Sequence, residues 1–186
     1  VLEGGWDRDL FRGRELGDKV VGLVGVGRLG TLVAGYLRAF GCTVLGYDPR
    51  PDYPHDVAER VSSLPELMAR VDIVSLHLTY DRSTRHLIDA AQLAYLRPHA
   101  VLINTARGGV LDDRALYDAL VSHRLAGAAL DVIDGEPEVG REHPLVALAR
   151  TTDRVLLTPH LGGNTFESFE KTELFLAGRV VEALGS

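Results

Sequence analysis

Three ionisable side chains each follow a short apolar run: Arg107 in NTARGG, Glu136 in DVIDGEPE and His160 in LTPHLGG. A histidine that titrates near neutral pH can accept the proton of a secondary alcohol as its hydride leaves, and can return it in the reverse reduction. A carboxylate beside the ring stabilises its protonated form, and an arginine offers a planar fork to a substrate carboxylate. The three residue types together suit hydride transfer to and from an alcohol that carries a carboxylate.

Each of these side chains also has a structural explanation. A histidine at a strand end is often capped or solvated, Arg-Gly-Gly can form a surface turn, and Glu-Pro is a common pair in loops. Their joint placement beside a nucleotide-binding loop favours the functional interpretation. Among the other six histidines, only His77, at the end of an apolar run, is expected to line a cofactor cleft.

The nucleotide-binding loop is the hexapeptide GVGRLG, which has the GxGxxG spacing between a predicted strand and a predicted helix. Gly25 lets the chain turn tightly, Gly27 lets the backbone approach a pyrophosphate, and Gly30 lets the helix pack closely on the strand. The helix opens at Arg28 and Leu29, where unpaired N–H groups and a partial positive charge face the phosphates. This context predicts a dinucleotide site, whereas a bare glycine turn would explain only the spacing.

An acidic residue, Asp48, ends the next predicted strand 18 residues after Gly30. This is the position at which a carboxylate grips the hydroxyls of the adenosine ribose. A 2′-phosphate beside it would suffer like-charge repulsion, so NAD is favoured over NADP. Arg50 stands two residues away and could partly offset that repulsion, which leaves the strictness of the preference open.

Short apolar strands alternate with amphipathic helices along the whole chain. This alternation predicts βαβ units and a Rossmann-type, doubly wound parallel sheet with helices on both faces, in one domain over residues 1–186. Strands are expected at 19–25, 43–47, 73–78, 100–103, 126–130 and 154–157, with a weaker one at 59–61. Ligands bind beyond the carboxyl ends of such strands, which is where the ionisable side chains stand.

Helix positions follow from apolar spacing and from capping residues. Ser63 and Glu66 form a predicted capping box, and Asp112-Asp113 place negative charge at another helix start. The helix after the glycine loop is expected to lay one stripe on the sheet, made of Leu29, Leu32, Val33, Tyr36, Leu37 and Phe40. The last helix, from about 165 to 184, has Phe166, Phe169, Leu176, Val180 and Leu184 on one side.

Composition limits the classes of partner. The chain has 186 residues, of which 46% are hydrophobic, and this is enough for one substantial core. A net charge of -6 argues against nucleic acid or an anionic membrane as the main partner. The single cysteine, Cys42, is expected to be a small buried hydrophobe, and without a signal-like amino terminus or a membrane-spanning stretch the cytoplasm is the expected compartment. No metal site is predicted.

Several motifs together resemble the NAD-binding domain of the D-isomer-specific 2-hydroxyacid dehydrogenases. They are GREL at 13–16, GLVGVGRLG, the acid of GYDPR, INTARGGVLDD, AALDVIDGEPE and LTPHLGGNT, and the resemblance extends over essentially the whole chain. One departure is Thr79, where the family usually has proline. The glutamate of DGEPE distinguishes the chain from the related formate dehydrogenases, which carry glutamine there.

The resemblance implies a role for each matched residue. Arg107 would bind the substrate, Glu136 would pair with the histidine, and His160 would be the acid and base. Asp131 would hold the nicotinamide amide. Further cofactor contacts would come from Thr105 and Ala106 near the nicotinamide ribose, and Gly162 and Gly163 would leave room beside the ring.

The family also has a second, smaller substrate lobe, which this sequence lacks, so we expect a domain that folds and binds NAD but turns over a 2-hydroxyacid poorly. The family often dimerises through this domain, so a homodimer is one alternative here, and the sequence leaves the oligomeric state open. An alternative from another class is an NAD-sensing module similar to the dehydrogenase-like transcriptional corepressors. The sequence does not name the hydroxyacid.

Overall fold

The computed structural model describes residues 4–10, 12–50 and 56–185. Seven parallel strands form one sheet in the order β3-β2-β1-β4-β5-β6-β7. The strands are β1 (Val20–Val24), β2 (Thr43–Tyr47), β3 (Glu59–Arg60), β4 (Ile73–Leu76), β5 (Val101–Asn104), β6 (Gly127–Leu130) and β7 (Val155–Leu157). The helices are α1 (Arg28–Ala39), α2 (Leu64–Arg70), α3 (Ala90–Leu93), the 3₁₀ turn η1 (Gly108–Val110), α4 (Asp113–Val121), α5 (Pro144–Ala149) and α6 (Phe166–Leu184).

The sheet confirms the predicted Rossmann-type fold. Strand order reverses at β1, which pairs with β2 on one side and with β4 on the other. In sheets of this kind, dinucleotides bind in the crevice at such a switch point. Each predicted strand is present, including the short β3. The fold thus places the glycine loop at the switch point.

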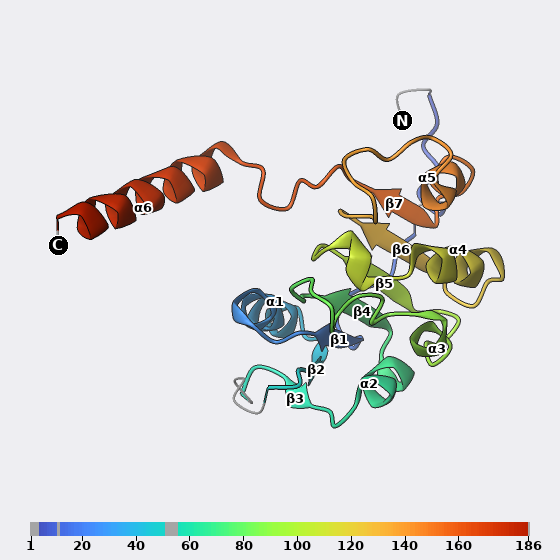
Figure 1. The fold of residues 1–186 in the computed structure, drawn as a ribbon. Helices are drawn as coiled ribbons and strands as arrows, with labels where there is room; N and C mark the ends of the chain where they lie inside the picture. Colours follow the sequence, from blue (N-terminus) through green and yellow to red (C-terminus); the bar gives the residue numbers. More distant parts are fainter. Residues whose placement is uncertain (1–3, 11, 51–55, 186) are drawn as a thin grey trace.

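Helices cover both faces of the sheet. Figure 1 shows α1 on one face and α2, α3 and α4 on the opposite face. The larger apolar cluster lies on the α2–α4 side and contains Leu67, Leu102 and Leu116, each fully buried. The smaller one includes Ala34 and Cys42, so the lone cysteine is a buried hydrophobe as predicted. This packing explains why the strands are apolar on both sides.

The apolar stripe predicted for α1 is only partly correct. Gly30 and Ala34 are the buried residues of α1, and Val33 and Leu37 pack against the smaller cluster. A Cβ on Gly30 would lie 2.3 Å from the Gly25 carbonyl oxygen, so at this position the helix lies too close to β1 for any side chain. The other four members of the predicted stripe are exposed, namely Leu29, Leu32, Tyr36 and Phe40.

The last helix, α6, extends away from the sheet (Figure 1). Thr165 caps it, because its hydroxyl oxygen accepts a hydrogen bond from the N–H of Ser168 at 3.0 Å. All of α6 lies in the described part of the chain, and none of its residues is buried. Its predicted apolar stripe is therefore exposed. Within the described ranges, no helix has the length and apolar character needed to cross a membrane.

Capping at the other helices follows the sequence prediction. The Ser63 hydroxyl accepts from the N–H of Glu66, whose carboxylate accepts from the N–H of Ser62. The Asp112 carboxylate caps α4 by accepting from the N–H groups of Arg114 and Ala115. These caps fix where α2 and α4 begin.

Candidate active site

The imidazole of His160 and the carboxylate of Glu136 form a hydrogen-bonded pair. The distance from Nδ1 of the ring to Oε1 of Glu136 is 2.8 Å. The two residues follow β7 and β6, which are neighbours in the sheet, so their strands end at the same edge. The His160 side chain is 47% exposed and that of Glu136 30% exposed. The pair therefore leaves Nε2 of the ring to exchange a proton with a bound molecule.

Asp131 shapes the turn that presents His160. Its carboxylate accepts hydrogen bonds from the Thr158 hydroxyl at 2.5 Å, from the N–H of Leu161 at 2.7 Å and from the N–H of Gly162 at 2.8 Å. Burial opposes ionisation of this carboxyl, but these donors together outweigh it and lower its pKa. The backbone of His160 has φ +54 and donates to the Asp131 carbonyl. Asp131 thus holds an uncommon backbone conformation at the histidine.

Gly162 is constrained by the same carboxylate. A Cβ at this position would lie 3.1 Å from Oδ2 of Asp131, whereas a Cβ at Gly163 would meet no described atom within 4 Å. Space beside the turn therefore opens at Gly163. The contact between Asp131 and the turn was not part of the sequence prediction. The strand order could have indicated this contact, because a residue directly after β6 lies beside the residues directly after β7.

The loop that carries Glu136 is held by contacts with two neighbouring segments, η1 and α4. A Cβ on Gly108 would lie 2.2 Å from the carbonyl carbon of Ile133, so the first glycine of the Arg-Gly-Gly segment is required by close packing. The N–H of Asp134 donates to the Asp113 carboxylate at 3.0 Å. These contacts hold the start of the loop against η1 and α4. A cavity of about 560 Å³ lies beside it, lined mainly by apolar side chains together with Asp131, Glu136 and His160.

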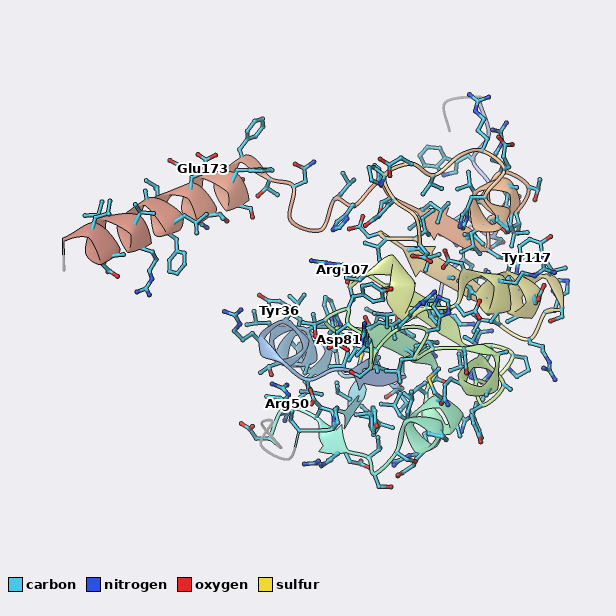
Figure 2. All side chains as sticks on the ribbon, viewed as in Figure 1. Tyr36, Arg50, Asp81, Arg107, Tyr117 and Glu173 are labelled. Atoms are coloured by element: carbon cyan, nitrogen blue, oxygen red, sulfur yellow. The ribbon has the colours of Figure 1, made fainter. Side chains whose placement is uncertain are left out.

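Arg107 is exposed at the end of β5. Its Nη1 donates to the carbonyl of Ala106 at 2.6 Å, and the described lining of the cavity does not include it. Figure 2 shows it extending from the η1 segment on the side where α1 lies in this view. The buried Asn104 fixes the backbone there, because its amide donates to the Arg107 carbonyl and accepts from the N–H of Ala106. Thr105, between them, is exposed.

The glycine loop has the close contacts that its spacing predicts. Gly25 has φ +93, and a Cβ there would lie 2.5 Å from the His77 carbonyl oxygen. By contrast, the atom nearest to a Cβ on Gly27 would be Nη2 of Arg50, at 3.7 Å. The helix starts at Arg28 with Gly27 as its N-cap. The open space at Gly27 and the N–H groups of the helix start fit a pyrophosphate.

Asp48 closes this crevice at the end of β2. It is 6% exposed, and its Oδ2 accepts from the N–H of Val26 within the glycine loop at 2.9 Å. The Arg50 side chain donates to both carboxylate oxygens, from Nε at 2.9 Å and from Nη2 at 2.8 Å. These donors, with Arg50 first, lower the pKa of Asp48 to about 2 despite its burial. The residue is an ionised acceptor at neutral pH.

His77 lies under the glycine loop. Its Nε2 is 3.0 Å from the Ser75 hydroxyl, and its Nδ1 is buried without a hydrogen-bond partner among the described residues. Burial lowers its pKa. A Cβ on Gly30 would lie 3.7 Å from the Cβ of His77. The backbone and Cβ of His77 thus pack against the glycine loop, and its role in lining a cofactor cleft stays a prediction. The nearby Thr79, which departs from the family pattern, accepts a hydrogen bond from Thr84 at its carbonyl.

Comparison with known families agrees with this geometry. Residues 1–162 match the family model described as D-isomer specific 2-hydroxyacid dehydrogenase, NAD binding domain. The chain belongs to this family. The match includes the glycine loop, Asp48, Arg107, Glu136 and His160, so this is an NAD-binding domain.

Proteins similar to this chain include dehydrogenases and reductases. The D-3-phosphoglycerate dehydrogenase of Methanocaldococcus jannaschii is 38% identical over 99% of this chain. Among solved structures, the D-lactate dehydrogenase of Aquifex aeolicus, complexed with NAD and lactic acid, has a TM-score of 0.84 and 33% identity over 99% of this chain. An acyclic imino acid reductase in complex with NADPH and D-Arg has a TM-score of 0.86 and 30% identity over 99% of this chain.

The chain spans 34% of the length of the phosphoglycerate dehydrogenase, 59% of the lactate dehydrogenase and 57% of the imino acid reductase. The similarity therefore concerns one part of each relative. Because these relatives are oxidoreductases, the comparison does not favour the corepressor hypothesis.

Proposed function

We propose that this domain catalyses reversible hydride transfer between a D-2-hydroxyacid and NAD, as the catalytic and cofactor-binding part of a dehydrogenase. The observation that carries the proposal is the 2.8 Å pair of His160 and Glu136. It lies at the edge of the sheet where the glycine loop also ends, so a nucleotide held by the loop and an acid-base group share one side of the molecule.

His160 moves the proton. Glu136 holds Nδ1 of the ring, so Nε2 accepts the hydroxyl proton of the substrate as the hydride leaves, and returns it in the reduction. The carboxylate stabilises the protonated ring, in the same way as an acidic partner orients other catalytic histidines. Arg107 pairs with the carboxylate of the substrate and polarises the neighbouring carbonyl.

The residues that would hold NAD follow the crevice at the switch point. Gly25, Gly27 and Gly30, with the helix start at Arg28 and Leu29, would bind the pyrophosphate, and Asp48 would bind the adenosine ribose. When bound, NAD supplies the nicotinamide carbon that exchanges the hydride. At the nicotinamide end, the contacts would come from Thr105, Ala106, Asp131, Gly162 and Gly163.

The exposure of His160 and Glu136 bears on turnover. Hydride transfer needs a site from which water is excluded and in which the reacting atoms are held in line. A ring that is 47% exposed lacks this cover within the described chain. We infer that residues 1–186 act as a single NAD-binding domain, and that a substrate lobe in the complete enzyme covers the pair.

Single-turnover kinetics with excess protein test the proposal. The chain is mixed with NAD and either the D or the L isomer of lactate, 3-phosphoglycerate or glycerate, and formation of the reduced nicotinamide is followed. We expect slow transfer from a D isomer. A His160→Gln variant should lower the rate about 1,000-fold and Glu136→Gln about 10- to 100-fold.

Nucleotide affinity should be unchanged in Glu136→Gln, since the pair faces the reacting end only. Glu138→Gln is the matched control, because it makes the same substitution two residues further along the same loop. Transfer from L isomers alone, transfer that does not depend on His160, or no transfer from any of these substrates would contradict the proposal.

A further inference from the structure

We propose that Arg50 sets the nucleotide preference of this domain. By occupying the Asp48 carboxylate, it lets the adenosine end accept a 2′-phosphate nearly as well as a 2′-hydroxyl. The inference rests on the proposed contact of Asp48 with the ribose. It goes beyond that contact, because it assigns the discrimination between NAD and NADP to the counter-ion instead of the acid.

The acceptor sites of Asp48 are already filled by protein donors. Oδ1 accepts from the backbone N–H and from Nε of Arg50, and Oδ2 accepts from the N–H of Val26 and from Nη2 of Arg50. A carboxylate has about four lone-pair positions. A ribose diol can therefore bind Asp48 only if the guanidinium withdraws, and the hydrogen bonds that it gives up oppose NAD binding.

Repulsion between Asp48 and a 2′-phosphate is also reduced. Such repulsion needs a bare carboxylate, whereas Asp48 and Arg50 form a pair at 2.8 Å with no net charge. Within the pair, the Arg50 side chain is 57% exposed and the Asp48 side chain 5%. An incoming nucleotide thus meets the cation first, and a planar guanidinium suits a phosphate.

The position of Arg50 places it on the path of a dinucleotide. Its Nη2 lies 3.7 Å from the point that a Cβ on Gly27 would occupy, beside the loop expected to hold the pyrophosphate. Figure 2 shows Arg50 between α1 and β3. A second guanidinium lies close by, because Arg60 donates to the Arg50 carbonyl at 3.3 Å. Two arginine side chains, Arg50 and Arg60, therefore lie at this corner of the crevice.

Calorimetric titration with NADH and with NADPH tests the proposal on the chain itself, without any need for turnover. For the native protein, we expect dissociation constants for the two nucleotides that differ by less than about 10-fold. In Arg50→Ala, binding of NADH should tighten and binding of NADPH should weaken, so that their ratio rises by about 10-fold or more. Arg50→Lys keeps the positive charge but not the planar guanidinium. Its ratio of the two dissociation constants should lie between those of the native protein and Arg50→Ala.

Two controls separate this proposal from others. Arg97→Ala removes an exposed arginine near the opposite ends of the strands, and should leave the ratio of the two dissociation constants unchanged. Thermal unfolding of Arg50→Ala checks that the domain still folds, as expected for a side chain that is mostly exposed.

An Arg50→Ala variant that binds both nucleotides more weakly by the same factor would overturn the proposal, because Arg50 would then only hold Asp48 in place. An unchanged ratio, or a native ratio that already exceeds about 100-fold in favour of NADH, would overturn it as well. Asp48→Asn distinguishes the underlying assumption. If that variant binds NADH with the same dissociation constant as the native protein, the proposed contact between Asp48 and the ribose is wrong, independently of the result for Arg50.

Discussion

Two halves of the sheet edge hold their functional groups in different ways. In the cofactor half, formed by β1, β2 and α1, Asp48 is 6% exposed, and Gly25 and Gly30 pack at distances that exclude a side chain. In the catalytic half, at the ends of β5, β6 and β7, Arg107 is exposed, and the side chain of His160 is 47% exposed. The cofactor half is thus built into the core, whereas the catalytic half presents its side chains outward.

The backbone of the catalytic half is nevertheless held in place by hydrogen bonds to three side chains. Asn104 holds the segment of Arg107, Asp113 holds the start of the glutamate loop, and Asp131 holds the turn of His160. Of these three side chains, Asn104 and Asp131 are buried and hydrogen-bonded, and buried polar groups held in this way give a backbone one defined conformation. The reacting groups are therefore pre-positioned by the backbone, and their exposed side chains still need a covering surface.

Replacing Gly30 should have the largest effect on stability. The added methyl group of Gly30→Ala would lie 2.3 Å from the Gly25 carbonyl, which would separate α1 from β1. We expect the free energy of unfolding in urea to fall by about 3 kcal/mol, together with a loss of NADH binding.

Gly35→Ala is the matched control in the same helix. A Cβ at Gly35 would meet no described atom within 4 Å, so this substitution should raise the free energy of unfolding by about 0.5 to 1 kcal/mol. Equal destabilisation by the two variants would mean that the cofactor half is not held by close backbone packing.

Acid should weaken the cofactor half through Asp48. Its folded-state pKa of about 2 lies below the usual 3.8, so the stability that it contributes is present above the usual value and is lost as the pH falls toward 2. We expect a loss of about 1 to 2 kcal/mol, because its partner Arg50 is mostly exposed. Asp48→Asn should flatten this acid limb in urea unfolding at a series of pH values. A limb of unchanged slope would show that the pair does not stabilise the fold.

Asp113, in the catalytic half, should behave in the opposite direction. Burial raises the pKa of its carboxyl, against hydrogen bonding from Asp134 and the attraction of His143, and Oδ1 has no partner among the described residues. Its contribution to stability is full below the usual pKa and is lost as the pH rises through the raised value. In the same unfolding series, Asp113→Asn should remove that loss, a change of about 1 kcal/mol or less.

The smallest effect is expected from α6. None of the residues of this fully described helix is buried, so its removal should change the free energy of unfolding by less than about 0.5 kcal/mol. The measurement compares the unfolding of residues 1–164 with that of the whole chain. A larger loss would mean that α6 covers part of the sheet in solution, and the contrast between the two halves would then need revision.

Much of this architecture could be predicted from the sequence. The spacing of Gly25, Gly27 and Gly30 with Asp48 predicts the crevice, because each glycine meets a local backbone requirement. Short apolar runs predict the strands, and charged residues after them predict the catalytic edge. The α1 stripe was only partly correct, since Val33 and Leu37 pack on the core but Leu29 does not. Apolar periodicity shows that a helix has an apolar side, but not how near the sheet each part of it lies.

What the sequence determined by itself is local: turns that need glycine, strands that need two buried faces, and helix starts that need a capping oxygen. Only the tertiary structure decided which distant groups meet. The turn of His160 depends on Asp131, and the state of Asp48 depends on whether the Arg50 side chain folds back over it. Side-chain pairing is decided by the relative placement of the elements and by burial, and neither is encoded in residue spacing along the chain.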